Sequence, residues 1–314
     1  MTERLDHMGM TGMKKRAGFR YTMREVRRNG DLYLMMAPFF VLFLMFTIIP
    51  VGAAIVLSFT DFNALQTPSF IGLANYVKLF LEDAEFIISI KNTILFATIT
   101  GPASFMLCFV MAWFVNELSV KGRTVLTFLF YAPALSGNLY ILWTTVFAGD
   151  IYGWANGILI TLNIINEPIL WLRDPKYILT ILIIVQLWMS LGTSFLAFIA
   201  GLQSVDRNLY EAAAIDGVRN RWQELFYVTL PSMGPQLMFG AVMQISVSFA
   251  AGRISMDLAG MPSTDHAAST IVTHAIDYGY YRYEMGYACA IASLLFIIML
   301  AINKIIREGL SKYQ

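Results

Sequence analysis

The sequence carries little charge and little cysteine for its length. Only 14% of its 314 residues are charged, whereas a soluble domain usually carries about 25%. The formal net charge is +1, so no strongly basic surface for nucleic acid is indicated. The two cysteines, Cys108 and Cys289, both lie in apolar stretches and are interpreted as small packing residues that form no disulfide framework or metal cluster. The composition argues against a nucleic-acid-binding protein and against a disulfide scaffold.

The sequence also lacks the common catalytic signatures. It contains no G-x-x-x-x-G-K-[ST] phosphate loop, so it cannot cradle ATP in that way. It contains no G-x-S-x-G or H-E-x-x-H string. His266 and His274 lie eight residues apart in a predicted loop, and we expect them to be surface residues rather than metal ligands. We therefore expect no catalytic residue, no metal and no cofactor in this chain, and no enzymatic activity.

Long uncharged runs are the main positive feature. Hydrophobic residues make up 57% of the chain, and the mean hydropathy is +0.61. Six uncharged windows have at least 19 residues each: 32–60, 92–116, 124–149, 177–205, 225–252 and 285–303. Because roughly 20 helical residues cross the hydrocarbon core of a bilayer, these windows predict an all-α polytopic membrane protein with six transmembrane helices. A shorter window, 151–166, predicts an outer loop with a short surface helix.

The predicted spans define the domain organisation. We place a basic N-terminal segment at 1–30, one transmembrane domain at 31–308 and a short tail at 309–314. The cytoplasmic loop after the fourth span covers 204–225. The spans themselves are expected at 32–59, 88–116, 125–148, 178–203, 226–251 and 285–306.

The distribution of Lys and Arg predicts the orientation. Sixteen of the 22 basic residues lie in the two terminal segments and in the loops that share their side of the membrane. Positive charge in short loops stays in the cytoplasm, so both termini are expected there, in a multi-pass protein surrounded by lipid in the cytoplasmic (inner) membrane. The spans have almost no ionisable residue for a proton or ion relay. If the chain moves a solute, its energy is expected to come from another subunit.

The loop after the fourth predicted span has the most informative pattern. Ser204 or Asp206 can cap a helix, and the run to Ile215, with three consecutive alanines, is a good helix former. Gly217 supplies a left-handed stop, and a second helix is expected to begin near Arg221. The small alanine face allows close approach by another surface. The residues alone leave two interpretations open, an amphipathic connector and a docking element.

The sequence of this loop resembles that of a known protein family. The strings Glu211-Ala212-Ala213, Gly217 and Val228-Thr229-Leu230-Pro231 resemble the EAA loop of ABC importer permeases, in the carbohydrate branch of maltose-type permeases. The stretches 70–76, 92–93 and 285–291 are similar to the same branch. One departure is visible: ten residues separate Gly217 from Val228, where nine are expected, and we place the extra residue in the turn beyond Gly217.

The resemblance implies a type I ABC importer permease fold and a role for the loop. In this family the loop forms a coupling helix that docks in a cleft of an ATPase subunit, and it drives alternating access. The motif positions in this chain are Glu211, Ala212, Ala213, Asp216, Gly217, Leu230 and Pro231. The implied partners are a second homologous permease, two ATPase subunits that hold ATP and Mg²⁺, and an extracellular or periplasmic solute-binding protein. The implied cargo is a sugar or oligosaccharide.

Other functions stay open at this point. The same machine could carry glycerol phosphate or a polyamine, although an arginine-lined path would favour an anionic cargo and none is seen within the predicted spans. A non-transporting scaffold or a channel subunit is the alternative from another class, but no filter-like loop is found.

Polar uncharged side chains inside the spans are the candidates for a solute path. Amides and hydroxyls can bind sugar hydroxyl groups, and aromatic faces can cover the C–H surface. The candidates are Asn138, Tyr140, Gln186, Trp188, Ser190, Thr193, Gln244 and Ser248. For each single residue, hydrogen bonding between helices is the competing interpretation.

Overall fold

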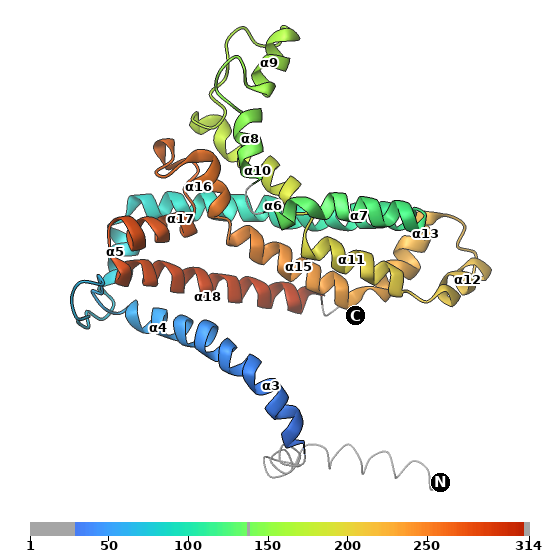
Figure 1. Ribbon diagram of the computed structural model, residues 1–314, viewed down its shortest axis with the longest axis horizontal. Coiled ribbons are helices and arrows are strands. Elements are labelled where there is room, and N and C mark those ends of the chain that lie inside the picture. The colour runs from blue at the N-terminus through green and yellow to red at the C-terminus, as the bar shows by residue number, and fades with distance from the viewer. Residues whose placement is uncertain (1–28, 137–138, 311–314) are drawn as a thin grey trace. The chain divides into compact units, whose positions relative to one another are not determined.

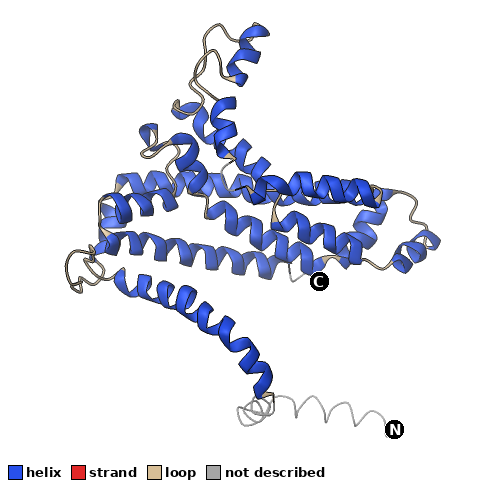
Figure 2. Ribbon diagram, in the orientation of Figure 1, coloured by secondary structure: helices blue, strands red, loops and turns tan. Residues whose placement is uncertain are grey.

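The computed structural model describes residues 29–136 and 139–310, and within them the regular structure consists of helices joined by loops and turns (Figure 1). The only β-type pairing in this part of the chain is one bridge between Thr60 and Phe70, and Figure 2 shows no strand. The chain divides into two units, Met1–Val56 and Leu57–Gln314. Most of the predicted basic segment and of the tail lies outside the described residues.

The first unit is one long apolar helix where it is described. Helix α3 (Gly30–Phe43), the π-helical turn η1 (Leu44–Ile48) and α4 (Ile49–Leu57) follow one another without a break. Together they give 28 residues from Gly30 to Leu57, and none of the three elements has a buried residue. A helix that is apolar on all sides needs an apolar surrounding, which a bilayer or a partner helix supplies.

The second unit is a bundle around α6. Helix α6 (Ala84–Asn116) is 33 residues long and packs against α10, α11 and α15. Figure 1 shows α6, α7, α11, α15 and α18 running alongside one another. The other main helices are α5 (Ala74–Leu81), α7 (Val120–Leu135), α8 (Tyr140–Val146), α9 (Trp154–Thr161), α10 (Pro175–Met189), α11 (Thr193–Ser204), α15 (Gly234–Phe249), α16 (Arg253–Ala259), α17 (Ile271–Ile276) and α18 (Met285–Leu310).

Four helical segments are long and apolar enough to cross a membrane, and two bent pairs raise the number to as many as six. The four are Gly30–Leu57, Ala84–Asn116, Pro175–Ser204 and Met285–Gly309. The predicted span 125–148 corresponds to α7 and α8, which are bent by 89° across a break that includes the undescribed residues 137–138. The predicted span 226–251 corresponds mainly to α15, followed by α16 at 44°. The predicted short helix within 151–166 is present as α9.

A buried polar cluster ties the start of α6 to α17 and α18. The Asp83 carboxylate caps α6 by accepting from the Phe86 N–H at 2.9 Å. It also accepts the Tyr287 hydroxyl at 2.6 Å and lies 2.8 Å from His274 Nε2. Burial alone would raise the pKa of Asp83, but the bonds from Tyr287, His274 and Phe86 outweigh it, so this pKa is lowered from 3.8. The prediction that His274 is a surface residue is wrong, since it is 4% exposed.

The lowered pKa of Asp83 predicts an acid-sensitive stability. A carboxyl whose pKa is lower in the folded state stabilises the fold above its unfolded pKa, and this contribution is lost as pH falls through the folded value. Asp83→Asn should destabilise the purified protein by about 1–3 kcal/mol near neutral pH, and should flatten the fall in thermal stability below about pH 4. Thermal unfolding of both proteins in detergent from pH 3 to 7 measures this. The exposed Glu167→Gln serves as the control, and an unchanged acid slope in Asp83→Asn contradicts the prediction.

Candidate functional site

A cavity lies where α7, α8, α10, α11, α15 and α16 meet. Its volume is about 390 Å³, within the range of about 300–1,000 Å³ that is common for small-molecule sites. Five of the eight residues predicted for the solute path line it: Tyr140, Gln186, Ser190, Thr193 and Gln244. The sequence candidates therefore converge on one space, although they come from helices far apart in the chain.

Gln186 has the clearest ligand-binding geometry among these residues. It lies on α10 and is only 6% exposed, yet no hydrogen bond joins its amide to another residue in the part of the chain that the structure describes. Its amide does not belong to the polar atoms that are fully shielded, so the remaining accessible surface lies on the cavity side. A buried amide normally has hydrogen-bond partners, and a bound solute would supply them.

Gln244 and Ser190 have a partly structural role. The chain between α10 and α11 is unwound at residues 190–192, which leaves backbone groups without helical partners. The Gln244 Nε2 donates to the Ser190 carbonyl oxygen at 3.1 Å, and the Ser190 hydroxyl donates to the Leu187 carbonyl at 2.6 Å. The break in the helix is thus held from α15 and opens into the cavity. Non-helical backbone at membrane depth is tolerated where it is buried or lines a cavity.

The other three predicted path residues have different surroundings. Ser248 is 1% exposed and does not line the cavity. A Cβ added at Gly101 on α6 would lie 3.8 Å from its hydroxyl, so Ser248 belongs to the contact between α6 and α15. Trp188 packs edge-on against Trp143, with ring centres 5.3 Å apart, and does not line the cavity either. Asn138 lies outside the described residues.

Some lining residues are not predicted by the sequence. Tyr131 and Ser194 line the cavity and lie within predicted spans, but no local pattern distinguishes them. Arg253 also lines it, although it lies one residue beyond the uncharged window 225–252 and the sequence places it in an outer loop. The sequence signal that could have identified Arg253 is its position as a charged residue directly at the end of the uncharged window 225–252.

The loop after α11 carries the predicted helix as a protruding element. Helix α12 (Arg207–Ile215) has no buried residue, and Ile215 is 88% exposed. Asp206, rather than Ser204, caps it by accepting from the Asn208 N–H at 3.0 Å. Figure 1 shows α12 at the end of the bundle that also holds α13. One side-chain hydrogen bond, 2.9 Å between the hydroxyls of Tyr210 and Thr229, joins α12 to the chain that follows.

The end of α12 has the geometry predicted for Gly217. Gly217 has φ +96°, a left-handed conformation that favours glycine. Its N–H donates to the Ala214 carbonyl at 3.3 Å, and the Val218 N–H donates to the Ala213 carbonyl at 3.0 Å, which is the Schellman pattern of a helix end. Glu211, Ala212 and Asp216 are all exposed beside it. These three motif residues therefore form an exposed surface on a helix whose end is fixed by the Gly217 turn.

The second half of the loop is anchored to α6. Helix α13 (Arg221–Glu224) begins where a second helix is predicted. The Arg221 guanidinium bonds Glu224 at 2.7 Å and Glu117, just past the end of α6, at 3.2 Å; the bond to Glu224 and the charge of Glu117 raise the pKa of Arg221. Trp222 packs on Trp113 of α6 with ring centres 5.1 Å apart. A displacement of the loop would therefore be transmitted to α6.

Leu230 and Pro231 lie at the base of this segment. A π-helical turn, η2 (Leu225–Thr229), leads into the short helix α14 (Leu230–Ser232), and α15 starts at Gly234. Pro231 lies just after the π-helical turn, in a helical run that is continuous from Arg221 to Ser232. Neither residue lines the cavity between the helices; they connect the loop to α15.

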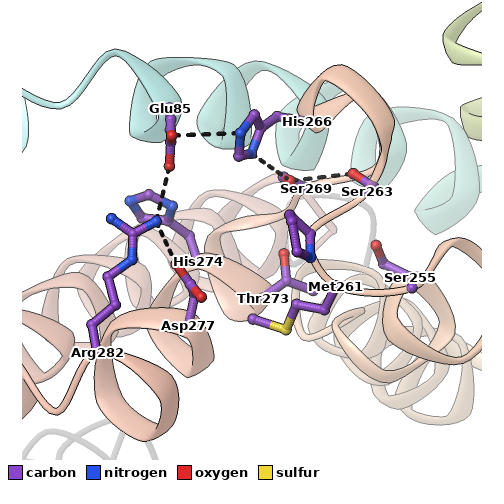
Figure 3. Close-up of a pocket in the computed structure, with 12 residues that line it drawn as sticks. Glu85, Ser255, Met261, Ser263, His266, Ser269, Thr273, His274, Asp277 and Arg282 are labelled. Carbon is purple, nitrogen blue, oxygen red and sulfur yellow. Dashed lines mark hydrogen bonds and ion pairs between the residues drawn. The ribbon is translucent and has the colours of Figure 1, made fainter.

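A second cavity lies at the far end of α6, beside the Asp83 cluster (Figure 3). It has about 200 Å³. Glu85 lies 3.3 Å from Arg282 and 3.5 Å from His266, and Asp277 lies 2.7 Å from Arg282. Burial first, and then the charge of Asp83, raises the pKa of the neighbouring Tyr278 to about 12. Glu85 and Asp277 thus share the guanidinium of Arg282. The described residues contain no group of three or more His, Cys, Asp or Glu that could hold a metal ion.

The fold and the site define a polytopic membrane transport protein with a polar cavity between its helices and a protruding loop. Comparison with known proteins gives its family. It is 32% identical over 283 residues to a probable ABC transporter permease protein, YesP, of Bacillus subtilis, with 88% of this chain and 89% of that protein covered. The chain therefore belongs to the family of carbohydrate-type ABC transporter permeases. No protein-family model matches the sequence.

Two other relatives and a solved structure agree with this assignment. The arabinooligosaccharides transport permease AraP of Bacillus subtilis is 29% identical, with 87% of this chain and 86% of AraP covered. The lactose transport permease LacF of Rhizobium radiobacter is 30% identical, with coverages of 68% and 70%. A chain of a bacterial ABC transporter involved in the import of the acidic polysaccharide alginate superposes with a TM-score of 0.76 at 24% identity, over 93% of this chain and 99% of that one. The last comparison shows the shared fold.

Proposed function

We propose that this chain is one of two permease subunits of an ATP-driven importer that moves a sugar or oligosaccharide across the cytoplasmic membrane by alternating access. The observation that carries the proposal is the buried Gln186 amide, which faces a cavity of about 390 Å³ without a protein partner among the described residues. Hydroxyl, amide and phenol groups around it suit the hydroxyl groups of a sugar. The relatives that transport arabinooligosaccharides and lactose support this class of cargo.

The same proposal makes residues 204–231 the segment of this chain on which an ATPase subunit docks. Helix α12 exposes Ile215, Ala212 and Ala214, and a protruding apolar surface of this kind is typical of a surface that another protein covers. A movement of the ATPase subunit would be transmitted through α12 and α13 to α6 and α15. ATP and Mg²⁺ would be held by two separate ATPase subunits, so this chain itself catalyses no reaction. The solute would arrive from an extracellular or periplasmic binding protein, and both termini would lie in the cytoplasm.

The proposal is tested by uptake into proteoliposomes that contain the complete complex, with ATP inside and the binding protein outside. Sugar accumulation that needs both ATP and the binding protein supports it. ATP hydrolysis without accumulation of any sugar, across neutral and acidic oligosaccharides, overturns it.

Gln186→Met should raise the sugar concentration for half-maximal uptake by about 3- to 10-fold, the worth of one or two neutral hydrogen bonds. Methionine has a similar volume and no polar donor, so the packing of α10 is preserved. Assembly and ATP hydrolysis should stay unchanged. The matched control is Thr180→Val, which removes a hydroxyl from an exposed position on the same helix outside the cavity. Equal effects of the two substitutions would exclude Gln186 from the solute path.

A further inference from the structure

The charge on the cavity wall is one-sided. Arg253 is the only charged residue among the described residues that line the cavity, and no carboxylate lines it. Its side chain is 63% exposed, and its Nε lies 3.3 Å from Asp257 Oδ2 one turn further along α16. Asp257 does not line the cavity. The positive end of this ion pair therefore faces the space between the helices, and the negative end lies outside it.

The position of Arg253 is not explained by the stability of α16. Arg253 is the first residue of this helix, where the helix dipole disfavours a cation by an amount comparable to what an exposed ion pair contributes. The ion pair with Asp257 therefore roughly cancels this cost and also restrains the direction of the guanidinium. Arg253 thus adds little net stability to α16 through these two effects, and its place in the lining of a polar cavity accords with a role there.

We propose that the cargo carries a single carboxylate, as in an oligosaccharide that contains a uronic acid, and that Arg253 selects it. The inference rests on the proposed importer function and names the chemical class of its substrate. A guanidinium binds a carboxylate through two parallel hydrogen bonds, which gives both energy and orientation. Gln186, Thr193 and Tyr140 provide amide, hydroxyl and phenol partners for the sugar hydroxyl groups in the same cavity.

The number of charges favours a carboxylate over a phosphate. A phosphate monoester carries about −1.5 to −2 charges at neutral pH, and the cavity offers one arginine whose charge Asp257 partly neutralises. A singly charged carboxylate matches one partly neutralised cation. Glycerol phosphate, the cargo named for the Agrobacterium fabrum relative UgpA at 28% identity, is therefore the competing anion in the test.

The test measures binding to the complete complex in lipid nanodiscs. The probes are disaccharides with one uronic acid and one neutral sugar, from glucuronate, galacturonate and mannuronate series, the same disaccharides after reduction of the carboxyl group, and glycerol 3-phosphate. In Arg253→Gln, the dissociation constant for the preferred acidic disaccharide should rise about 10- to 100-fold, as expected for a charge-assisted pair. Its neutral counterpart should change by less than about 3-fold. Arg253→Lys should retain part of the preference for the acid because it keeps the charge and loses the bidentate geometry.

Arg173→Gln is the matched control, because Arg173 is an arginine outside this cavity. Three results overturn the proposal: equal losses for acidic and neutral sugars in Arg253→Gln, no loss for any acidic sugar, or glycerol 3-phosphate as the tightest ligand. If neutral sugars are bound and imported and no acidic disaccharide binds more tightly than its neutral counterpart, the importer function stands and the acidic cargo is wrong. If no sugar of either kind is bound or imported, the proposed function fails as well.

Discussion

Gly217→Pro is expected to reduce ATP-driven uptake by the complete complex at least about 10-fold while the chain still inserts and assembles. Gly217 has φ +96°, and proline is restricted to φ near −65°. Proline also removes the N–H that bonds the Ala214 carbonyl at the end of α12. A Cβ at this position would meet no atom within 4 Å, so the effect comes from the backbone alone. The substitution changes the direction in which the chain leaves α12, and hence the link from α12 to α13.

Three measurements separate a coupling defect from misfolding. Copurification of the four subunits reports assembly, ATP hydrolysis reports the motor, and uptake reports coupling. Gly72→Pro is the matched control, since Gly72 has φ +62° with open space around a Cβ but lies before α5, far along the chain from α12. Uptake above half of the wild-type rate in Gly217→Pro contradicts the coupling role. An equal loss in Gly72→Pro would attribute the effect to general backbone strain.

Glu211→Lys probes the same surface without changing the backbone. Glu211 is exposed on α12, so a reversed charge there should leave the helix folded and weaken docking of an ATPase subunit. Loss of uptake in both variants with normal assembly would point to the surface of α12 rather than to its shape.

The local features of this loop are predictable because they depend on few neighbouring residues. A short polar side chain ahead of an alanine run sets the start of α12 at Asp206. A glycine after the run sets its end at Gly217. The apolar windows likewise locate the helices, because a bilayer requires long uncharged stretches whatever the tertiary arrangement. The extra residue between Gly217 and Val228 is predicted in the turn after Gly217. The π-helical turn at Leu225–Thr229 offers another place for it, since such a turn holds one residue more than an α-turn.

The features that depend on tertiary packing are not predictable from composition or spacing. His274 is expected at the surface, but it is buried against Asp83, 191 positions away. Ser248 and Gln244 lie on the same helix one turn apart and look equivalent in sequence, yet only Gln244 lines the cavity. The place of Arg253 depends on the bend between α15 and α16, which turns the residue toward α8 and α10.

Gly240→Val is expected to destabilise the bundle more than the loop substitutions at Gly217 and Glu211 do. A Cβ at Gly240 on α15 would lie 2.2 Å from Cζ and 2.5 Å from Cε1 of Phe198 on α11, far inside contact distance. The Phe198 ring is fully buried and packs edge-on against Phe105 and Phe109. Because these rings occupy the space into which Phe198 could turn, α11 and α15 would have to separate. Overpacking of this kind costs about 1–3 kcal/mol and sometimes more.

The separation would also disturb the cavity, since Ser194 on α11 and Gln244 on α15 both line it. We expect Gly240→Val to lower the yield of monodisperse protein after detergent extraction several-fold and to lower its melting temperature. Gly309→Val is the control, because a Cβ there meets no atom within 4 Å.

A double-mutant cycle assigns the effect to the contact with Phe198. Phe198→Ala alone leaves a cavity and should cost about 3–5 kcal/mol. In the double variant the valine at position 240 fills part of that space. The stability lost by the double variant should therefore be smaller than the sum of the losses of the two single variants, by more than about 0.5 kcal/mol. Strict additivity would show that α11 and α15 can move apart at little cost, and would contradict a rigid contact at Gly240. Sub-additivity would show that the close approach of these two helices, which holds the unwound segment 190–192 against α15, depends on a residue without a side chain.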